Sequence, residues 1–137
     1  MGAVNVVGEK SPMAQATEIH LIDARAVEQG ATYDELTLTW ADEDTGDPIN
    51  ITGYTVEMDI KASPSASTAL ATLSSTAGDF IITGATGEIQ FNFSSDTTAA
   101  FDFTRGVYDL FLIAAGGEPA RKIAEGQIHV IPRITSF

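Results

Sequence analysis

The sequence predicts an all-β domain, an antiparallel sandwich of two sheets that is immunoglobulin-like in the loose sense and carries one short helix. Apolar and polar residues alternate in several runs of four to eight residues, as half-buried strands require. Clusters of Gly, Pro, Ser and Asp separate these runs, and the only helix-like stretch is residues 94–101. A length of 137 residues fits one core, and the absence of cysteine excludes disulfides and any Cys-based metal or catalytic site.

The chain divides into three parts by composition. Residues 1–16 have no sustained period, and we expect an extended N-terminal arm without a core of its own. Residues 17–132 form the sandwich domain, and residues 133–137 form a C-terminal tail. Thr17 to Asp23 reads as a first strand, and Gly30 marks a bend before the next one.

The clearest alternation lies in residues 36–60. Leu36, Leu38 and Trp40 alternate with threonines, and a second alternating run covers residues 54–60. The acidic segment between them contains Gly46 and Pro48, which are turn formers. We therefore predict that the two runs pair as a hairpin and start the sandwich.

The middle of the chain predicts shorter strands. Residues 63–67 form a loop of small polar residues and Pro, and residues 68–73 form a strand with less regular spacing. Residues 80–82 and 88–93 flank a turn with glycines at both ends, which is typical of a hairpin.

The last third begins with a change of period. Ser94 or Ser95 can cap a helix of one or two turns, and Phe101 and Phe103 then close the end of the core. Residues 107–113 are apolar on both faces except for Asp109, as expected of a central strand. Residues 121–131 alternate again, with Gly126 predicted as a bulge at their midpoint.

The formal net charge is −12 at pH 7, and such a field repels the phosphates of nucleic acids. Residues 17–61 hold 11 acidic and 2 basic residues, whereas residues 111–137 hold 2 acidic and 3 basic ones. One part of the surface can therefore meet a basic partner, or its acids serve only solubility and block pairing at sheet edges. The longest strongly apolar run, residues 110–115, is too short to span a membrane, which takes about 20 residues.

Three segments resemble a known family. The pattern W-x-D-E-D-x-G-x-P-I-x-[IL]-T-G-Y-T-x-x-M-x-I covers residues 40–60, RGVYDL covers 105–110, and KIAEGQIHVIP covers 122–132. They are similar, in this order, to structural domains of tailed phages, such as the N-terminal domain of phage baseplate upper proteins. Domains of this kind recur in tail, baseplate and fibre-attachment proteins.

The resemblance implies a non-enzymatic virion protein that acts through contacts with other virion proteins or with its own copies in a symmetric ring. The chain lacks the long C-terminal extension of baseplate upper proteins, which leaves tail, baseplate, neck and fibre-attachment positions open. A capsid decoration protein is an alternative. No signal-peptide layout is present, so we expect assembly in the host cytoplasm and residence in the virion.

No residue pattern predicts catalysis, and we expect no cofactor. The sequence lacks G-x-S-x-G and phosphate-loop motifs. Residues 42–47 resemble the start of a calcium loop, but Gly46 falls where a ligand is needed, so a solvated turn is the simpler reading. His20 and His129 would approach each other only if the first and last strands pair, and they lack the further ligands of a zinc site.

Two further hypotheses concern binding. Trp40, Tyr54 and Tyr108 could form a sugar-binding face, as in a carbohydrate-binding sandwich, but their strand positions favour the core, where Tyr108 can direct its hydroxyl to backbone at the sandwich edge. The loose ends are candidates for contacts between subunits. Their apolar residues, which we predict as interface positions, are Val4, Val6, Val7, Ile134 and Phe137.

Overall fold

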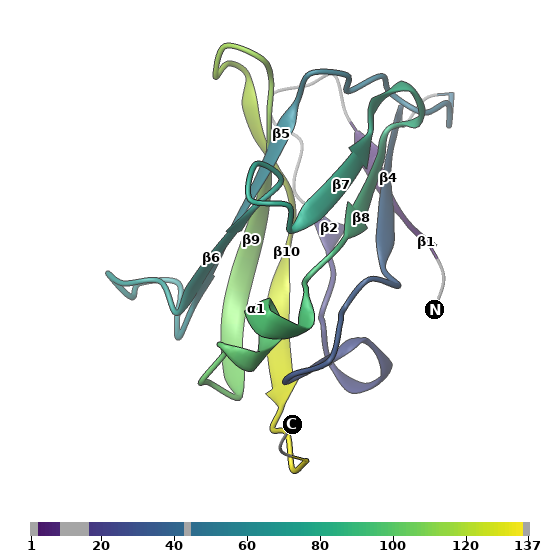
Figure 1. Cartoon of the computed structure of the whole chain (residues 1–137). Coiled ribbons are helices and arrows are strands. Elements are labelled where there is room, and N and C mark those ends of the chain that lie inside the picture. Colours follow the sequence, from purple (N-terminus) through teal and green to yellow (C-terminus); the bar gives the residue numbers. More distant parts are fainter. Residues whose placement is uncertain (1–2, 9–16, 43–44, 136–137) are drawn as a thin grey trace.

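The computed structural model describes residues 3–8, 17–42 and 45–135. Ten strands form two facing sheets, with one α-helix at the lower end in Figure 1 and two 3-10 turns. The predicted two-sheet β-sandwich with one short helix is therefore confirmed. The strands are β1 (Ala3–Gly8), β2 (Thr17–Glu18), β3 (Val27–Glu28), β4 (Thr37–Asp42), β5 (Thr55–Lys61), β6 (Ala71–Ser74), β7 (Phe80–Thr83), β8 (Glu88–Phe91), β9 (Arg105–Ile113) and β10 (Ala120–Ile131). The helix α1 spans Ser95–Ala99, and the 3-10 turns span Asp23–Arg25 and Gly84–Thr86.

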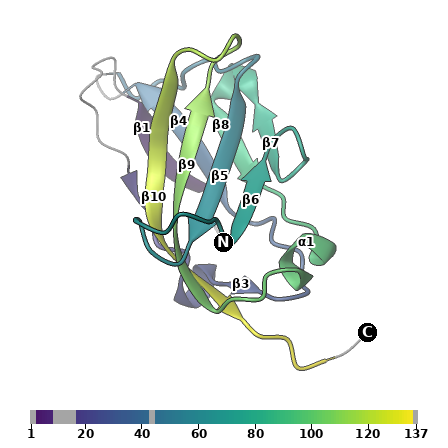
Figure 2. The same ribbon diagram turned by 90° about the vertical axis from the view of Figure 1, so that its left-hand side faces the viewer.

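The smaller sheet has the strand order β1-β4-β8-β7. The larger sheet has the order β2-β10-β9-β5-β6, with β3 also paired to β10. Figure 2 shows β10, β9, β5 and β6 of this larger sheet side by side in front of the smaller one. The strands β9 and β10 are the longest, and β9 lies at the centre as its apolar sequence predicts.

The predicted hairpin of residues 36–60 is wrong. Strand β4 pairs with β1 and β8, whereas β5 pairs with β6 and β9 in the other sheet. The connection between them crosses from one sheet to the other and buries Ile51 completely on the way. Both strands still direct one apolar row into the same core, because the core lies between the two sheets.

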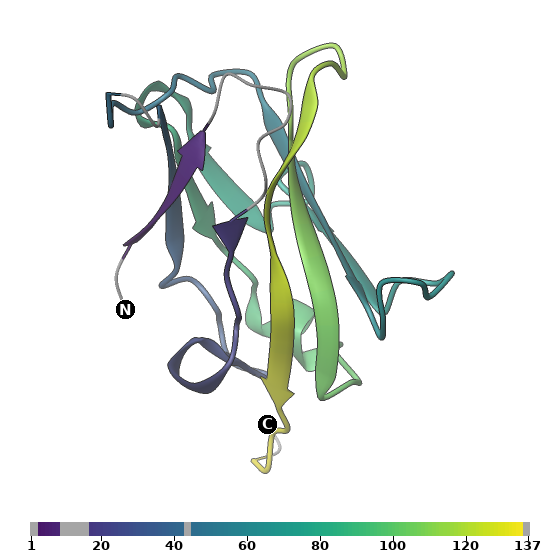
Figure 3. The same cartoon turned by 180° about the vertical axis from the view of Figure 1, so that it is seen from behind.

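The pairing is not antiparallel throughout. The pairs β1 with β4, β2 with β10 and β3 with β10 are parallel, and all three involve segments before residue 29. Figure 3 shows β1 beside β4, and β2 beside β10. The segment predicted as a free arm therefore contributes a strand, Ala3–Gly8, to the edge of the smaller sheet.

The strand expected at residues 17–23 covers only Thr17–Glu18, and the other predicted elements are found close to their expected places. Strands β7 and β8 form the expected hairpin, and the side-chain oxygen of Ser94 accepts a hydrogen bond from the Thr97 amide as the N-cap of α1. Phe101 is buried and Phe103 packs against the core. The strand expected at residues 68–73 begins later, at Ala71.

The predicted bulge at Gly126 is wrong. The register between β9 and β10 shifts between Lys122 and Ala124, so the bulge lies at Ile123. Glycine is needed at position 126 for a different reason: a Cβ on this residue would lie 2.8 Å from the carbonyl carbon of Ile19. Only glycine lets the two backbones approach so closely.

The core closes at the helix end through aromatic rings and three hydrogen bonds. The rings of Phe80, Phe91 and Phe93 meet with centroids 5.1 to 5.6 Å apart. The hydroxyl of buried Thr98 donates to the Ala31 carbonyl at 2.9 Å and accepts from the Gly30 amide at 3.0 Å. The side-chain amide of Gln29 donates to the Phe101 carbonyl at 2.8 Å, so α1 is fixed to the loop after β3.

Candidate functional site: the outer face of the larger sheet

The outer face of the larger sheet carries a hollow of about 770 Å³, lined by side chains of β2, β5, β9 and β10. The side chains that alternate with the core row reach this face. We call it the acidic sheet face and define it by six of them: Glu18, Asp59, Val107, Asp109, Phe111 and Glu125. Figure 2 views the molecule from the side on which this sheet lies in front.

Carboxylates of four adjacent strands lie in one row across this face. Asp59 on β5 is the register partner of Asp109 on β9, and Glu125 on β10 is the next partner of Asp109. Glu18 on β2 is in turn the partner of Glu125. Partners in register project to the same side of a sheet, so the strand order places four acidic side chains side by side.

Two members of the row, Glu18 and Glu125, have basic side chains as neighbours. The Nε2 atom of His20 lies 2.8 Å from Glu18 Oε1, and the Nζ atom of Lys122 lies 3.0 Å from Glu125 Oε1. The Nδ1 atom of His20 accepts a hydrogen bond from the Gln127 amide at 3.0 Å, which anchors the ring to β10.

The other two carboxylates of the row, Asp59 and Asp109, differ from these. Within the described part of the chain, no hydrogen bond or ion pair joins the carboxylate of Asp59 or Asp109 to another group. Burial raises the pKa of Asp109, and nearby Asp59 raises it further, while Lys122 and Lys61 lower it. The face therefore holds an acidic pair that the nearby lysines compensate only in part, since the pKa of Asp109 stays raised.

Apolar side chains flank this pair along the central strand. Val107, Phe111 and Ile113 lie on the same face of β9 as Asp109 and remain only partly buried, although β9 is the most central strand of the sheet. In the folded chain their outer surfaces line the hollow. The face thus combines apolar contact area with an excess of negative charge, since five carboxylates and two lysines line the hollow.

The histidines predicted as surface residues lie near the same sheet. The conditional expectation that the first and last strands pair is confirmed, because β2 runs beside β10. His20 binds Gln127 and Glu18, and the His129 amide donates to the Leu21 carbonyl at 2.9 Å. Within the described residues, no group of three or more His, Asp or Glu side chains is arranged to hold a metal ion.

The predicted core positions of two aromatic residues are confirmed. Trp40 is 6% exposed and Tyr108 is 5% exposed, so neither ring is available as a sugar platform. The Tyr108 hydroxyl donates to the Ile19 carbonyl at 2.5 Å, the backbone contact that the sequence predicted for it. Tyr54 packs against the core from a partly buried position.

The structure locates some of the predicted interface residues and not others. Val4, Val6 and Val7 are on β1, whose backbone pairs with Leu38, Trp40 and Ala41 of β4. Ile134 is 99% exposed. Phe137 and the connection after β1, residues 9–16, lie outside the described residues, as do Glu43 and Asp44 of the acidic loop.

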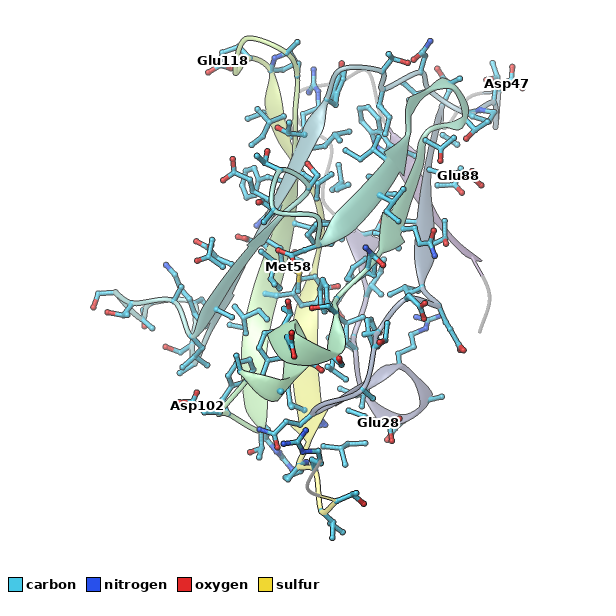
Figure 4. The ribbon with its side chains drawn as sticks, in the orientation of Figure 1. Glu28, Asp47, Met58, Glu88, Asp102 and Glu118 are labelled. Carbon is cyan, nitrogen blue, oxygen red and sulfur yellow. The ribbon has the colours of Figure 1, made fainter. Side chains whose placement is uncertain are left out.

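The acidic sheet face is separate from these predicted positions. Figure 4 shows Glu118 and Asp102 beyond opposite ends of β9, and Glu88 on the side of the smaller sheet. None of these three acids lines the hollow. In the described ranges, no helix has the length and apolar character needed to cross a membrane.

The fold and the face define a β-sandwich domain with a hollowed, acidic and partly apolar outer surface. The solved N-terminal domain of phage TP901-1 ORF48 is similar to the chain, with a TM-score of 0.41 and 12% sequence identity over 97% of this chain and 99% of that chain. The sequence predicted a likeness to phage domains of this kind. No protein-family model matches the chain, and no curated protein sequence matches it.

Proposed function

We propose that this chain is a non-enzymatic structural protein of a tailed-phage virion, and that it binds other virion proteins through the acidic sheet face. The observation that carries the proposal is the unpartnered outer face of the larger sheet. Its central strand leaves Val107, Phe111 and Ile113 only partly covered, around a carboxylate pair without a partner in the described structure. Exposed apolar area rimmed by polar groups is typical of a protein contact surface.

The sequence patterns at residues 40–60, 105–110 and 122–132 supply the phage part of the proposal. They resemble structural domains of tails, baseplates and fibre attachments. Those residues lie mostly in β4, β5, β9 and β10 and the segments that join them, which form much of the sandwich. A position in the tail, baseplate, neck or fibre attachment is consistent with a rigid domain that binds through its surface.

The ends of the chain add a second set of proposed contacts. The Arg133 amide donates a hydrogen bond to the side-chain oxygen of Gln29 at 3.1 Å. The next residue, Ile134, extends into solvent. Strand β1, with Val4, Val6 and Val7, forms one edge of the smaller sheet, and an edge strand can pair with a neighbouring chain. Copies arranged in a ring would use such contacts head to tail.

The direct test is to find the chain in particles. Virions are purified by density gradient from a host that expresses the chain with a small epitope tag, and the tag is located by immunogold labelling and by mass spectrometry of the particles. A fixed copy number per particle and labelling at one position are expected. Complete absence from purified particles would refute the structural role.

A further inference from the structure

Two carboxylates of the acidic sheet face, those of Asp59 and Asp109, repel each other and so lower the stability of the fold. Asp59 and Asp109 stand directly opposite each other on neighbouring antiparallel strands. Like charges in this position repel each other, and an opposite-charge or polar pair would stabilise the sheet better. Lys122 pairs with Glu125, and Lys61 is the other lysine that lines the hollow. Five carboxylates line the same hollow, those of Glu18, Glu57, Asp59, Asp109 and Glu125, so negative charge remains in excess.

Partial burial of Asp109 increases the stabilisation that a nearby positive charge would give. Asp109 is partly buried between two strands, and burial makes its charged form less favourable. A cation placed between two carboxylates in a partly desolvated site interacts more strongly than one at a fully exposed site. The carboxylate pair thus fits an ammonium or guanidinium group.

The apolar part of the face limits what can carry that cation. Phe111 is the register partner of Glu57 and Lys122, one row away from the acidic row, and Ile113 follows one row further along β9. A bound group therefore contacts carboxylates and apolar side chains within two residues of each other along β9. A peptide segment that carries both basic and apolar side chains matches this spacing, whereas a small metal ion does not.

We propose that the acidic sheet face binds a basic, partly apolar segment of another protein, with one Lys or Arg side chain between Asp59 and Asp109. The apolar side chains of that segment rest on Val107, Phe111 and Ile113. This inference rests on the proposed function, of which it names the partner's chemistry. A second copy of the chain is the wrong occupant, because it has a net charge of −12 and would bring the same carboxylates against this face.

The test uses the full chain and three fluorescein-labelled peptides of about ten residues. The first alternates Arg with Val, the second replaces Arg by Lys, and the third replaces Arg by Gln. Fluorescence anisotropy measures the dissociation constant of each peptide at low and at physiological salt. We expect the two basic peptides to bind and the Gln peptide to bind at least about tenfold more weakly.

Two double variants with equal net charge distinguish binding at this site from general attraction of a basic peptide to the negatively charged protein. D59N/D109N removes the two facing carboxylates of Asp59 and Asp109. D34N/D102N removes two exposed carboxylates outside the hollow, so both variants have the same net charge. We expect D59N/D109N to weaken the Arg peptide about tenfold or more and D34N/D102N less than about twofold. Circular dichroism verifies that both variants keep the strand content of the parent chain.

Equal weakening by the two double variants would overturn the proposal, because binding would then reflect only net charge. Equal binding of the Gln peptide, or no binding of either basic peptide, would also overturn it. Failure of this proposal leaves the virion role open, since the chain can still be found in particles. Absence from particles, in contrast, removes the virion role whatever the peptides do.

Discussion

Tyr108 on β9 and Ile19 beside β10 are joined by a hydrogen bond, 2.5 Å long, from the tyrosine hydroxyl to the backbone carbonyl. The two residues are 89 positions apart in the chain, and both are buried. The bond attaches the segment after β2 to the central strands. Ile19 and Leu21 continue this attachment, since their amides donate to Glu125 and Gln127 carbonyls at 2.8 Å.

Tyr108→Phe should lower the free energy of unfolding by about 1 to 2 kcal/mol, because the Ile19 carbonyl loses a buried partner. Urea denaturation followed by tryptophan fluorescence measures the change. Tyr54→Phe is the matched control, because no described hydrogen bond uses the Tyr54 hydroxyl, and it should change stability by less than about 0.5 kcal/mol. An equal effect of the two variants would show that the hydroxyl contact with Ile19 contributes nothing.

Tyr33 should make the free energy of unfolding fall as the pH rises above about 10. Its hydroxyl donates to the Arg25 carbonyl at 2.6 Å, and burial raises the pKa of Tyr33 to about 12. A raised pKa in the folded state gives stability that is complete below the unfolded value, about 10, and is lost as pH rises towards 12. Burial also raises the pKa of Tyr108, so it acts in the same direction.

The measurement is urea denaturation at pH 9 and pH 11 for the parent chain and Tyr33→Phe. The parent should lose about 1 kcal/mol more than the variant over this interval. A parent and a variant with the same loss would contradict the assignment of this pH dependence to Tyr33.

Gly126→Ala should destabilise the fold by about 2 kcal/mol or more, because the new methyl group would collide with the Ile19 backbone. The φ angle of Gly126 is not in the left-handed region, so the collision alone is responsible. Gly78→Ala provides the contrast: φ is +91° there, but nothing lies within 4 Å of the added Cβ. Thermal melting should show a smaller loss at Gly78, of about 1 kcal/mol. A loss at Gly126 no larger than that at Gly78 would rule out the close approach.

Asp109→Asn should raise the free energy of unfolding at pH 7 by about 0.5 kcal/mol, because it removes the repulsion with Asp59 and the cost of burying a charge. The pKa of Asp109 is raised in the folded state, so its penalty disappears when the carboxyl is protonated at lower pH. The advantage of the variant should therefore shrink as pH falls through that pKa. Asp102→Asn, which removes an exposed carboxylate, should show no such pH-dependent advantage in the same urea series. A variant less stable than the parent at pH 7 would mean that Asp109 is compensated within the fold.

Much of the sandwich could be predicted from local patterns. Alternation identified β4, β5 and β10, an apolar run identified β9, and the hydroxyl of Ser94 identified the start of α1. The period of two shows which side chains point inward, but the inner faces of two facing sheets look alike in sequence. For this reason the chain gave no sign that β4 and β5 belong to different sheets. The parallel pairings of β2 and β3 were missed because two residues leave no periodic signal. Strand β1 was missed because the first 16 residues show no sustained period, although β1 pairs over six residues.

The acidic sheet face could not be predicted from the sequence for a related reason. Glu18, Asp59, Asp109 and Glu125 are distant in the chain, and only the order of the strands places them in one row. One signal was present: Asp109 is the single charged residue between Val107 and Ile113, in a strand that is otherwise apolar on both faces.

The most direct test measures incorporation into particles for the two charge-matched double variants. The tagged parent chain, D59N/D109N and D34N/D102N are expressed in infected cells at equal levels, and their amounts in purified virions are compared by quantitative mass spectrometry. The parent and D34N/D102N should be incorporated to similar extents, whereas D59N/D109N should be depleted at least about tenfold. Incorporation of D59N/D109N at the parental level would contradict the role of the acidic sheet face in assembly.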